Sequence, residues 1–354
     1  MSTISLCMIV KNEEDSLARC LDSVAGLVDE IIIVDTGSDD RTVEIAKKYT
    51  SGVYSFPWID DFAAARNYSF SRAKMDFCMW LDADDVMEEE HRKEFRAMKN
   101  NLQAETDIVM MKYNVAFDDK GKPTFSYFRE RLLRNDGTHI WKGAVHEAIV
   151  PAGNILYSEI AVSHKKIKPG DSDRNLNIYR KMIAKGEILE ARHQYYYARE
   201  LYYHGEYREA SEALTAFFDM PEGWVENRIE ACSIASYCYE RMNQPEKALT
   251  VLFQSFQYDL PRAEICCDIG KLFLSRHKYD QAIYWYQKAL EVKKDDRRGG
   301  FLLLDCYDYI PYIQLCVCYD RLGDRINAVR YNELAGECRP NSAAYLQNKQ
   351  YFDK

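Results

Sequence analysis

Three short clusters of polar side chains each follow an apolar run in the first quarter of the chain. They are Lys11-Asn12-Glu13, Asp35-Thr36-Gly37-Ser38-Asp39-Asp40 and Asp82-Ala83-Asp84-Asp85. Residues two apart in an extended segment point the same way, so the carboxylates of Asp82 and Asp84 can face one ion. Mg²⁺ and Mn²⁺ prefer such oxygen ligands and often complete their coordination with substrate phosphates. The clusters therefore predict a divalent cation that holds a phosphate-bearing ligand.

Two other ways of binding a phosphate do not match the sequence. The loop after the first apolar run is not rich in glycine, which argues against a dinucleotide-binding turn, and no Gly-x-x-x-x-Gly-Lys phosphate loop is present. A sugar nucleotidyltransferase would need a basic, glycine-rich loop at this place, and residues 11–16 (KNEEDS) are neither. For Asp39 and Asp40, capping of the next helix is the alternative interpretation.

The hydrophobic pattern around these clusters alternates strands with helices over the first 165 residues. Strands are expected at residues 4–10, 30–34, 52–56, 77–81, 108–115 and 155–162. Helices are expected at residues 13–25, 41–49, 62–73 and 88–100. The alternation predicts an α/β domain with a mostly parallel sheet, with shorter β segments between residues 124 and 162. Because ligands bind beyond the carboxyl ends of parallel strands, the polar clusters are expected on one edge of this sheet.

The second half of the chain repeats a helical pattern. Four turn segments end in an alanine, and they are GEYREA at Ala210, NQPEKA at Ala248, HKYDQA at Ala282 and GDRINA at Ala328. Each lies between two helical patterns, and the arrangement resembles tetratricopeptide repeats, whose period is about 34 residues. The longest spacing, between the last two alanines, predicts an insertion or a lengthened helix. The many tyrosines either fill grooves between helices or line a peptide-binding groove.

A polar stretch with Pro169 and Gly170 separates the two patterns. It predicts an α/β domain at residues 1–168 and an all-α helical-repeat domain at residues 169–354. Composition agrees, since 47% of the 354 residues are hydrophobic, which is enough for two packed domains.

Charge and composition exclude several classes of protein. The net charge of −9, without a long basic stripe, argues against a nucleic-acid binder. No run approaches the roughly 18 apolar residues needed to span a bilayer. Residues 1–11 lack the basic lead and cleavage site of a signal peptide. The eleven cysteines are scattered and never spaced Cys-x-x-Cys, which predicts reduced thiols and a cytoplasmic location.

Four segments resemble family 2 glycosyltransferases of the GT-A fold, which is Rossmann-like. They are SLCMIVKNEE, EIIIVDTGSDDRT, WIDDFAAARN and LDADD, in the order and spacing of that family over roughly residues 4–90. WKGAVHE at residues 141–147, a later histidine and the helical repeats make the chain similar to sublancin-type peptide S-glycosyltransferases. The Gln-x-x-Arg-Trp motif of processive polysaccharide synthases is absent, which argues for transfer of a single sugar.

The resemblance implies how a nucleotide-sugar, with UDP as the nucleotide, would be bound. Asp35 would hydrogen-bond the base, with Lys11, Asn12 and Glu13 beside the nucleoside. Arg66 would lie near the base or the diphosphate, and an ion pair on the surface of its helix is the alternative.

The resemblance also implies a metal site for Mn²⁺ or Mg²⁺. Asp82 and Ala83 would contact the donor, and Asp82 would reach the ribose or the metal. Asp84 would be a metal ligand. His164 would complete the site, although relatives have His-x-Gly-Tyr where this chain has His164 followed by Lys-Lys-Ile.

Members of this family generally invert the anomeric centre, which requires a general base to take the acceptor's proton. Glu147 is the favoured base and His146 the second choice, while a structural role is the alternative for both. Trp141 lies close in sequence and is expected to stack on a sugar.

These expectations together predict transfer of one sugar to a peptide, protein or glycan acceptor. The repeats would hold the acceptor or mediate self-association. The alternatives are a non-catalytic scaffold that keeps a relic GT-A domain and a sugar nucleotidyltransferase.

Overall fold

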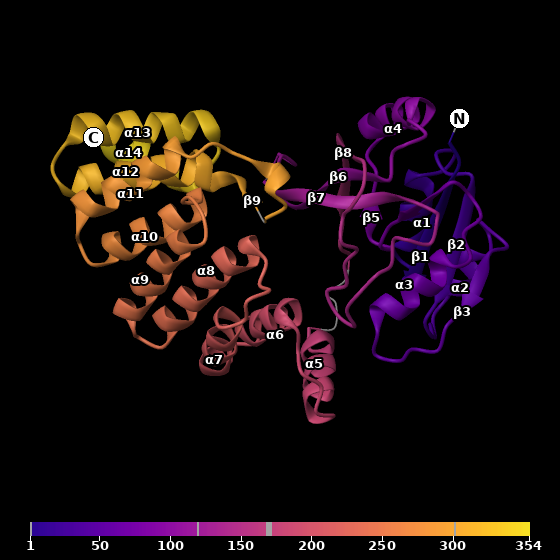
Figure 1. Cartoon of the computed structure of the whole chain (residues 1–354). Helices are drawn as coiled ribbons and strands as arrows, with labels where there is room; N and C mark the ends of the chain where they lie inside the picture. The colour runs from indigo at the N-terminus through magenta and orange to yellow at the C-terminus, as the bar shows by residue number, and fades with distance from the viewer. Residues whose placement is uncertain (1, 119, 168–171, 301) are drawn as a thin grey trace. The chain divides into compact units, whose positions relative to one another are not determined.

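The computed structural model describes residues 2–118, 120–167, 172–300 and 302–354. The chain forms two compact units, residues 1–188 and residues 189–354. Figure 1 shows the strands of the first unit in indigo to magenta and the helical hairpins in pink to yellow. The predicted boundary between residues 168 and 169 lies outside the described residues.

The first unit is built around one mixed β-sheet (Figure 1). Its strands lie in the order β3-β2-β1-β4-β7-β6-β8-β5. Their bounds are β1 Ile4–Val10, β2 Glu30–Asp35, β3 Val53–Ser55, β4 Phe77–Trp80, β5 Asp85–Val86, β6 Ile108–Phe117, β7 Pro123–Arg134 and β8 Ile155–His164. β1 pairs in parallel with β2 and β4, as β2 does with β3 and β6 with β8. The predicted α/β domain with a mostly parallel sheet is confirmed.

Strand β7 departs most from the sequence-based expectation. Short β segments are expected there, but β7 is a twelve-residue strand that runs antiparallel to β4 on one side and β6 on the other. Its buried stretch holds the charged residues Glu130 and Arg131 as well as apolar ones. Those charges interrupt the apolar pattern, which is why the sequence does not predict one long central strand.

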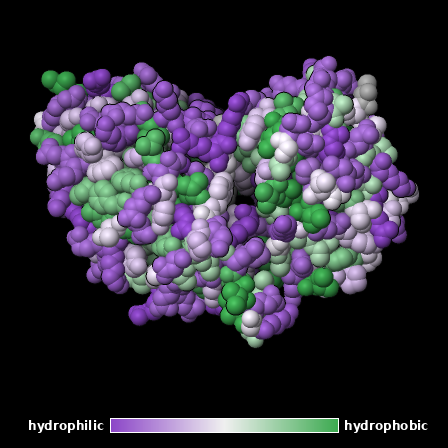
Figure 2. Space-filling view, in the orientation of Figure 1, coloured by the Kyte–Doolittle hydropathy of each residue, from purple (hydrophilic) through white to green (hydrophobic). Residues whose placement is uncertain are grey.

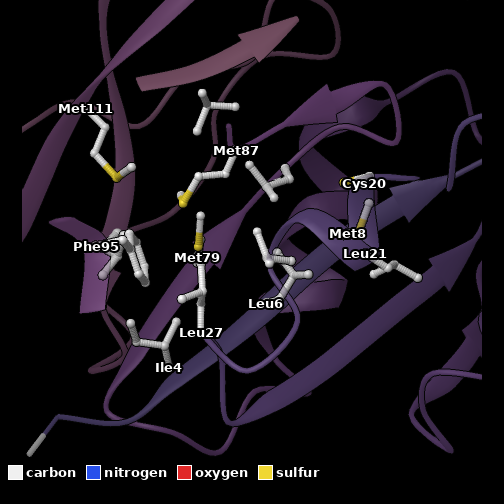
Figure 3. Close-up of a cluster of buried hydrophobic side chains, with 14 of the residues drawn as sticks. Ile4, Leu6, Met8, Cys20, Leu21, Leu27, Met79, Met87, Phe95 and Met111 are labelled. Carbon is white, nitrogen blue, oxygen red and sulfur yellow. The ribbon is translucent and has the colours of Figure 1, made fainter. Parts of the chain in front are cut away.

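Four helices cover the two faces of the sheet, and they are α1 Leu17–Ser23, α2 Thr42–Ala46, α3 Phe62–Phe70 and α4 Glu89–Asn101. A fifth helix, α5 Arg174–Ala184, follows the last strand of the unit. Alternate residues of β1 point to one face, where they pack with side chains of α1, α2 and α4. Figure 3 shows Ile4, Leu6 and Met8 in this cluster with Met79 and Phe95. α3 packs on the opposite face, since Tyr68 and Phe70 join the cluster around Cys7 and Val34.

Helix α1 starts later than the expected residue 13. The backbone N–H of Glu13 donates to Thr42 Oγ1 (2.7 Å) and that of Glu14 to Asp40 Oδ2 (3.2 Å). These bonds tie the loop after β1 to the loop after β2. The two loops therefore form one layer at the carboxyl ends of neighbouring parallel strands.

The second unit is a succession of helical hairpins. Its helices are α6 Ala191–Tyr203, α7 Tyr207–Phe218, α8 Val225–Arg241, α9 Pro245–Gln254, α10 Ala263–Ser275, α11 Tyr279–Glu291, α12 Tyr309–Arg321, α13 Arg325–Cys338 and α14 Ala343–Phe352. The shorter elements are η1 Ser255–Gln257, η2 Asp296–Arg298, β9 Leu302–Leu303 and η3 Leu304–Tyr307. The predicted helical repeats are confirmed. The long spacing before the last alanine is an insertion between α11 and α12 rather than a lengthened helix.

The repeated turns have the same physical basis in every hairpin. The alanines Ala210, Ala248, Ala282 and Ala328 are fully buried, so the two helices approach closely at each. The residue that opens each turn adopts a left-handed conformation, and these residues are Gly205, Asn243, His277 and Gly323. Tyr195 and Tyr286 are buried between helices, whereas Tyr203 and Tyr284 are mostly exposed.

The surface of each unit is mostly hydrophilic on the face seen in Figure 2, with small hydrophobic patches. Ten of the eleven cysteines are buried. Among the described residues, no helix combines the length and the apolar character needed to cross a bilayer.

Candidate active site

A buried arginine joins two carboxylates that come from distant parts of the chain. Arg66 of α3 donates from Nε to Oε1 of Glu147 (2.5 Å) and from Nη2 to Oδ1 of Asp82 (2.7 Å). The Arg66 side chain is 8% exposed, against 38% for Asp82 and 12% for Glu147. Burial opposes the charge on Asp82, but Arg66 outweighs it and lowers the pKa of that carboxyl to about 2. The alternative of a surface ion pair along α3 is wrong, because both partners lie outside the helix.

Helix α3 also fixes the segment that carries Glu147. Asn67 Nδ2 donates to the carbonyl oxygen of Trp141, and the Trp141 N–H donates to Asn67 Oδ1, both at 2.9 Å. At the start of the helix, the N–H of Phe62 donates to the carbonyl oxygen of Ala144 (2.9 Å). The helix is itself capped by Asp61, which accepts from Ala64 N–H. One helix therefore positions the arginine and the predicted base together.

His146 lies next to Glu147 in a left-handed conformation with φ of 50°. Such a conformation is uncommon for a residue with a side chain. A β-bridge between Lys142 and Ala148 closes the segment around it. The bend turns the chain immediately before Glu147, and the role of His146 stays a prediction.

Trp141 does not face a sugar site, because its side chain is buried. Its ring packs against Trp80 at 5.1 Å between centroids and against Phe70 at 5.9 Å. The guanidinium of Arg66 lies 4.8 Å from the Trp80 ring and 5.0 Å from the Trp141 ring. The expected stacking of Trp141 on a sugar is therefore wrong, and the indole instead shields the Arg66 ion pairs from water.

Asp84 and His164 come together because the loop after β4 meets the end of β8. Asp85 pairs with His164 in the β5–β8 register, and the N–H of Lys165 donates to the carbonyl oxygen of Asp84 (2.9 Å). Asp84 Oδ1 lies 3.3 Å from Nδ1 of His164. Hydrogen bonds to Asp84 and then Asp85 outweigh burial and raise the pKa of His164 to about 10.

The donor atoms here fit a hard divalent cation. One ligand atom from each of Asp84, Asp85 and His164 lies within 4.8 Å of the others. Carboxylate oxygens with one imidazole nitrogen suit Mn²⁺ or Mg²⁺. Asp82, also predicted as a ligand, lies outside this group and is bound to Arg66.

Asp85 is held from two sides by residues that the sequence does not identify. Arg131 Nη1 donates to Asp85 Oδ2 (3.1 Å), and neither side chain is exposed at all. Tyr113 donates its hydroxyl hydrogen to Asp85 Oδ1 (2.9 Å) and lies 3.0 Å from His164 Nδ1. The signal for Arg131 is a charge inside the apolar end of β7, and Tyr113 gives no signal at all.

Asp35 lies at the end of β2, opposite Val10 of β1. Its buried carboxylate accepts from the N–H groups of Gly37 (3.1 Å) and Ser38 (3.2 Å). Asn12 Oδ1 accepts from the N–H of Asp39 (2.9 Å), which brings the loop after β1 against the loop after β2. These contacts place the residues predicted to surround the nucleoside on one edge of the sheet.

The residues next to Asp35 and Asp82 in the predicted site differ in how exposed they are and in what they bind. Lys11 and Asn12 are exposed, while Glu13 is half-buried. Asp40 accepts from the N–H of Thr42 (2.8 Å), the first residue of α2, but the N-cap residue of this helix is Arg41. Ala83 is buried between the two acidic residues Asp82 and Asp84.

Comparison with known proteins matches the first unit to one family. Residues 5–158 match the profile of glycosyl transferase family 2. A TPR repeat-containing protein of Synechococcus elongatus is 37% identical over 149 residues, which cover 42% of this chain and 36% of that protein. The SPbeta prophage-derived glycosyltransferase SunS of Bacillus subtilis is 26% identical over 219 residues, covering 56% of this chain and 49% of SunS. The matches thus span about a third to a half of these relatives.

Solved structures show weaker likeness. The crystal structure of S. aureus TarS has a TM-score of 0.39 and 17% identity, over 70% of this chain and 54% of TarS. The crystal structure of MamA has a TM-score of 0.38 and 20% identity, over 50% of this chain and 87% of MamA. Neither is similar enough to indicate an activity. The sequence match confirms the expected resemblance to family 2 glycosyltransferases for residues 5–158.

Proposed function

We propose, from the family 2 glycosyltransferase domain at residues 5–158, that this chain transfers a single sugar from a nucleotide-sugar. UDP is the proposed nucleotide, the acceptor is a peptide, protein or glycan, and the anomeric centre is inverted. The observation that carries the proposal is the meeting of Arg66, Asp82 and Glu147 in one cluster. Buried ion pairs add little to stability beyond what apolar packing would give, so chemistry explains the cluster better than folding does.

The proposed donor site runs along the edge formed by the loops after β1, β2 and β4. Asp35 would accept from the base, and Lys11, Asn12 and Glu13 would flank the nucleoside. Asp82 would accept a hydrogen bond from the ribose or approach the metal, because its side chain is 38% exposed even while it is bound to Arg66. Arg66 is too buried to bind the diphosphate directly. We therefore assign it to holding Asp82 and Glu147 in place.

Glu147 is the proposed general base. Arg66 binds its Oε1, so we assign Oε2 to taking the proton from the acceptor as the acceptor atom attacks the anomeric carbon. A carboxylate fixed by an ion pair loses little freedom when the acceptor binds, which favours catalysis by position. His146 is the second candidate because it is the adjacent residue on the same bend.

Asp84 and His164 are the proposed residues for holding Mn²⁺ or Mg²⁺. When bound, such an ion would neutralise the charge that develops on the departing diphosphate.

The proposed catalytic domain is residues 1–168, and residues 169–354 are proposed to bind the acceptor or a second copy of the chain. Support for acceptor binding comes from exposed tyrosines on separate hairpins, such as Tyr203 of α6 and Tyr284 of α11. Tyrosine offers large contact area at low cost in conformational entropy. The acceptor atom can be an oxygen or a sulfur under this proposal.

Two measurements test the proposal. A panel of nucleotide-sugars is incubated with the full chain and release of the nucleotide is followed, with UDP-sugars expected to react first. UDP binding is then titrated calorimetrically with Mn²⁺ and with a chelator, and metal is expected to tighten it. Glu147→Gln should bind UDP normally but lose transfer. Lack of turnover with every donor would contradict the proposed sugar transfer. Equal UDP affinity with metal and with chelator would contradict the proposed metal site.

A further inference from the structure

The three residues that could hold a cation are not equivalent. Asp84 is partly exposed, with 21% of its side chain accessible, and His164 keeps 25%. Asp85 has no exposure, and both of its carboxylate oxygens are already bound, Oδ2 by Arg131 and Oδ1 by Tyr113. Oδ2 also accepts from the N–H of Asp82 (3.1 Å). A ligand role for Asp85 would require breaking these bonds inside the protein.

The Tyr113 hydroxyl fixes the direction of the bond to His164. A phenol carries one hydrogen, and Tyr113 donates it to Asp85 Oδ1 at 2.9 Å. The oxygen that remains can only accept, so Nδ1 of His164, 3.0 Å away, must carry a hydrogen. Asp84 Oδ1 faces the same nitrogen at 3.3 Å. Tyr113 and Asp84 therefore both hold the Nδ1 edge of the His164 ring.

Tyr113 is packed between a buried cation and an aromatic ring. Its ring lies under the Arg131 guanidinium, 4.4 Å away, and meets the ring of Tyr127 edge-on at 5.7 Å. Arg131 is sandwiched between Tyr113 and Trp80, whose ring is 4.0 Å from the guanidinium. Arg131 Nη1 also donates to the carbonyl oxygen of Trp80 (3.1 Å), the last residue of β4. The strand that precedes the Asp82–Asp84 loop is thus locked to the same network.

We propose that Tyr113, backed by Asp85 and Arg131, is a positioning residue that fixes the His164 ring beside Asp84 for cation binding, and that Asp85 is not a ligand. This inference rests on the metal site of the proposed function. Outer partners of a metal-binding histidine commonly contribute 10–100-fold to metal affinity by fixing the orientation of the ring. The groups that would produce such an effect here are the Tyr113 hydroxyl, the buried Asp85 carboxylate and the buried Arg131 guanidinium.

The test measures Mn²⁺ binding to the full chain from the electron paramagnetic resonance signal of the free ion. Tyr113→Phe keeps the ring and its packing but removes the hydroxyl, and it should weaken Mn²⁺ binding by about tenfold or more. Tyr49→Phe is the matched control, because Tyr49 also donates to a carboxylate, Asp22, at 2.9 Å but lies away from the site. The control should bind Mn²⁺ as the wild type does. Equal Mn²⁺ affinity of Tyr113→Phe and wild type would overturn the proposal.

A second pair of variants decides the role of Asp85, and it also serves if Tyr113→Phe does not fold. Asp84→Asn removes a proposed ligand and should reduce Mn²⁺ affinity severely. Asp85→Asn keeps an oxygen that can accept from Tyr113, so its affinity should stay within a few-fold of wild type. If folded Asp85→Asn loses Mn²⁺ as completely as Asp84→Asn, Asp85 is a ligand and the proposal is wrong.

The outcomes separate this inference from the proposed function. A wild-type chain that binds Mn²⁺ with no effect of Tyr113→Phe contradicts only the inference. A wild-type chain that does not bind Mn²⁺ overturns the inference and the metal site together, while glycosyl transfer is still decided by the nucleotide-sugar panel.

Discussion

Charged side chains are buried in both units, but they are assembled over different lengths of chain. In the α/β unit, Arg66 binds Asp82 and Glu147, which are 16 and 81 residues away. In the helical unit, Arg262 binds Glu226 and Asp259, 36 and 3 residues away, each at 2.7 Å. The repeat supplies a partner one hairpin away, whereas the sheet edge collects segments with no fixed spacing.

The two clusters also differ in what they leave open to solvent. Asp82 keeps 38% of its side-chain exposure, so its carboxylate can still meet a ligand. The side chains of Glu226 and Arg262 are only 10% and 11% exposed, and their ion pair joins neighbouring hairpins. We infer that the two ionic clusters serve different purposes, the first holding proposed catalytic residues in place and the second joining neighbouring hairpins. Removing a charge from the first should affect activity, and removing one from the second should affect stability alone.

The largest expected effect comes from Arg66→Met, which leaves two carboxylates without their cation. We expect sugar transfer to fall by about 100-fold or more, because Asp82 and Glu147 lose their fixed positions. Stability should fall by about 3 kcal/mol, the usual result of breaking a buried ion pair from one side. Steady-state kinetics and urea unfolding measure the two effects.

Arg262→Met is the matched control in the helical unit. It should lower the free energy of unfolding but leave kcat and KM for the donor unchanged. If it reduces kcat as strongly as Arg66→Met does, the separation between the two clusters fails.

Asp84→Ala should change activity with little change in stability. Its side chain is partly exposed and faces His164, so the fold does not depend on it. Metal-dependent turnover of the donor should fall by about 100-fold or more, the usual loss when charge stabilisation of a leaving group is removed. Circular dichroism and the melting temperature should match wild type. Near-normal turnover by this variant would refute its proposed role.

The sequence predicts the acidic residues at the edge of the sheet better than it predicts the contacts that hold them in place. Asp35 and Asp84 follow apolar runs, so strand alternation alone places them at one edge. The partnership of Arg66 with Glu147 spans 81 residues and depends on how the segment around Trp141 folds back on α3. Arg131 reaches Asp85 because β7 pairs antiparallel with β4, and no local pattern specifies that register.

The stability of the helical unit should depend on pH through the buried carboxyl group of Asp268. Burial raises the pKa of Asp268 to about 6, although hydroxyls of Tyr237 and Ser233 lower it. Its pKa in the unfolded chain is about 3.9, so the folded protein holds the proton more tightly. The contribution to stability is therefore complete below about pH 4 and is lost as pH rises through 6.

Asp268→Asn should remove this pH dependence. We expect the loss of unfolding free energy between pH 5 and pH 8 to shrink by on the order of 1–2 kcal/mol relative to wild type. Urea unfolding at each pH measures it, and Asp280→Asn, an exposed change on α11, is the control. A variant whose pH profile is as steep as that of wild type would show that Asp268 is not the titrating group.

The smallest expected effect concerns the left-handed residues, which differ in purpose between the units. In the α/β unit they include Asn12 and His146, which are themselves predicted site residues, whereas Gly323 and His277 only open helical turns. A side chain on Gly323 would meet no atom within 4 Å, so Gly323→Ala should cost only the backbone penalty, about 1 kcal/mol. His277→Gly should have the opposite sign and stabilise by up to about 1 kcal/mol, less the loss of the contact with the Tyr279 hydroxyl at 3.0 Å. Thermal unfolding measures both, and donor turnover should not change in either. Changes of the same sign would mean that the left-handed conformation does not limit stability at these turns.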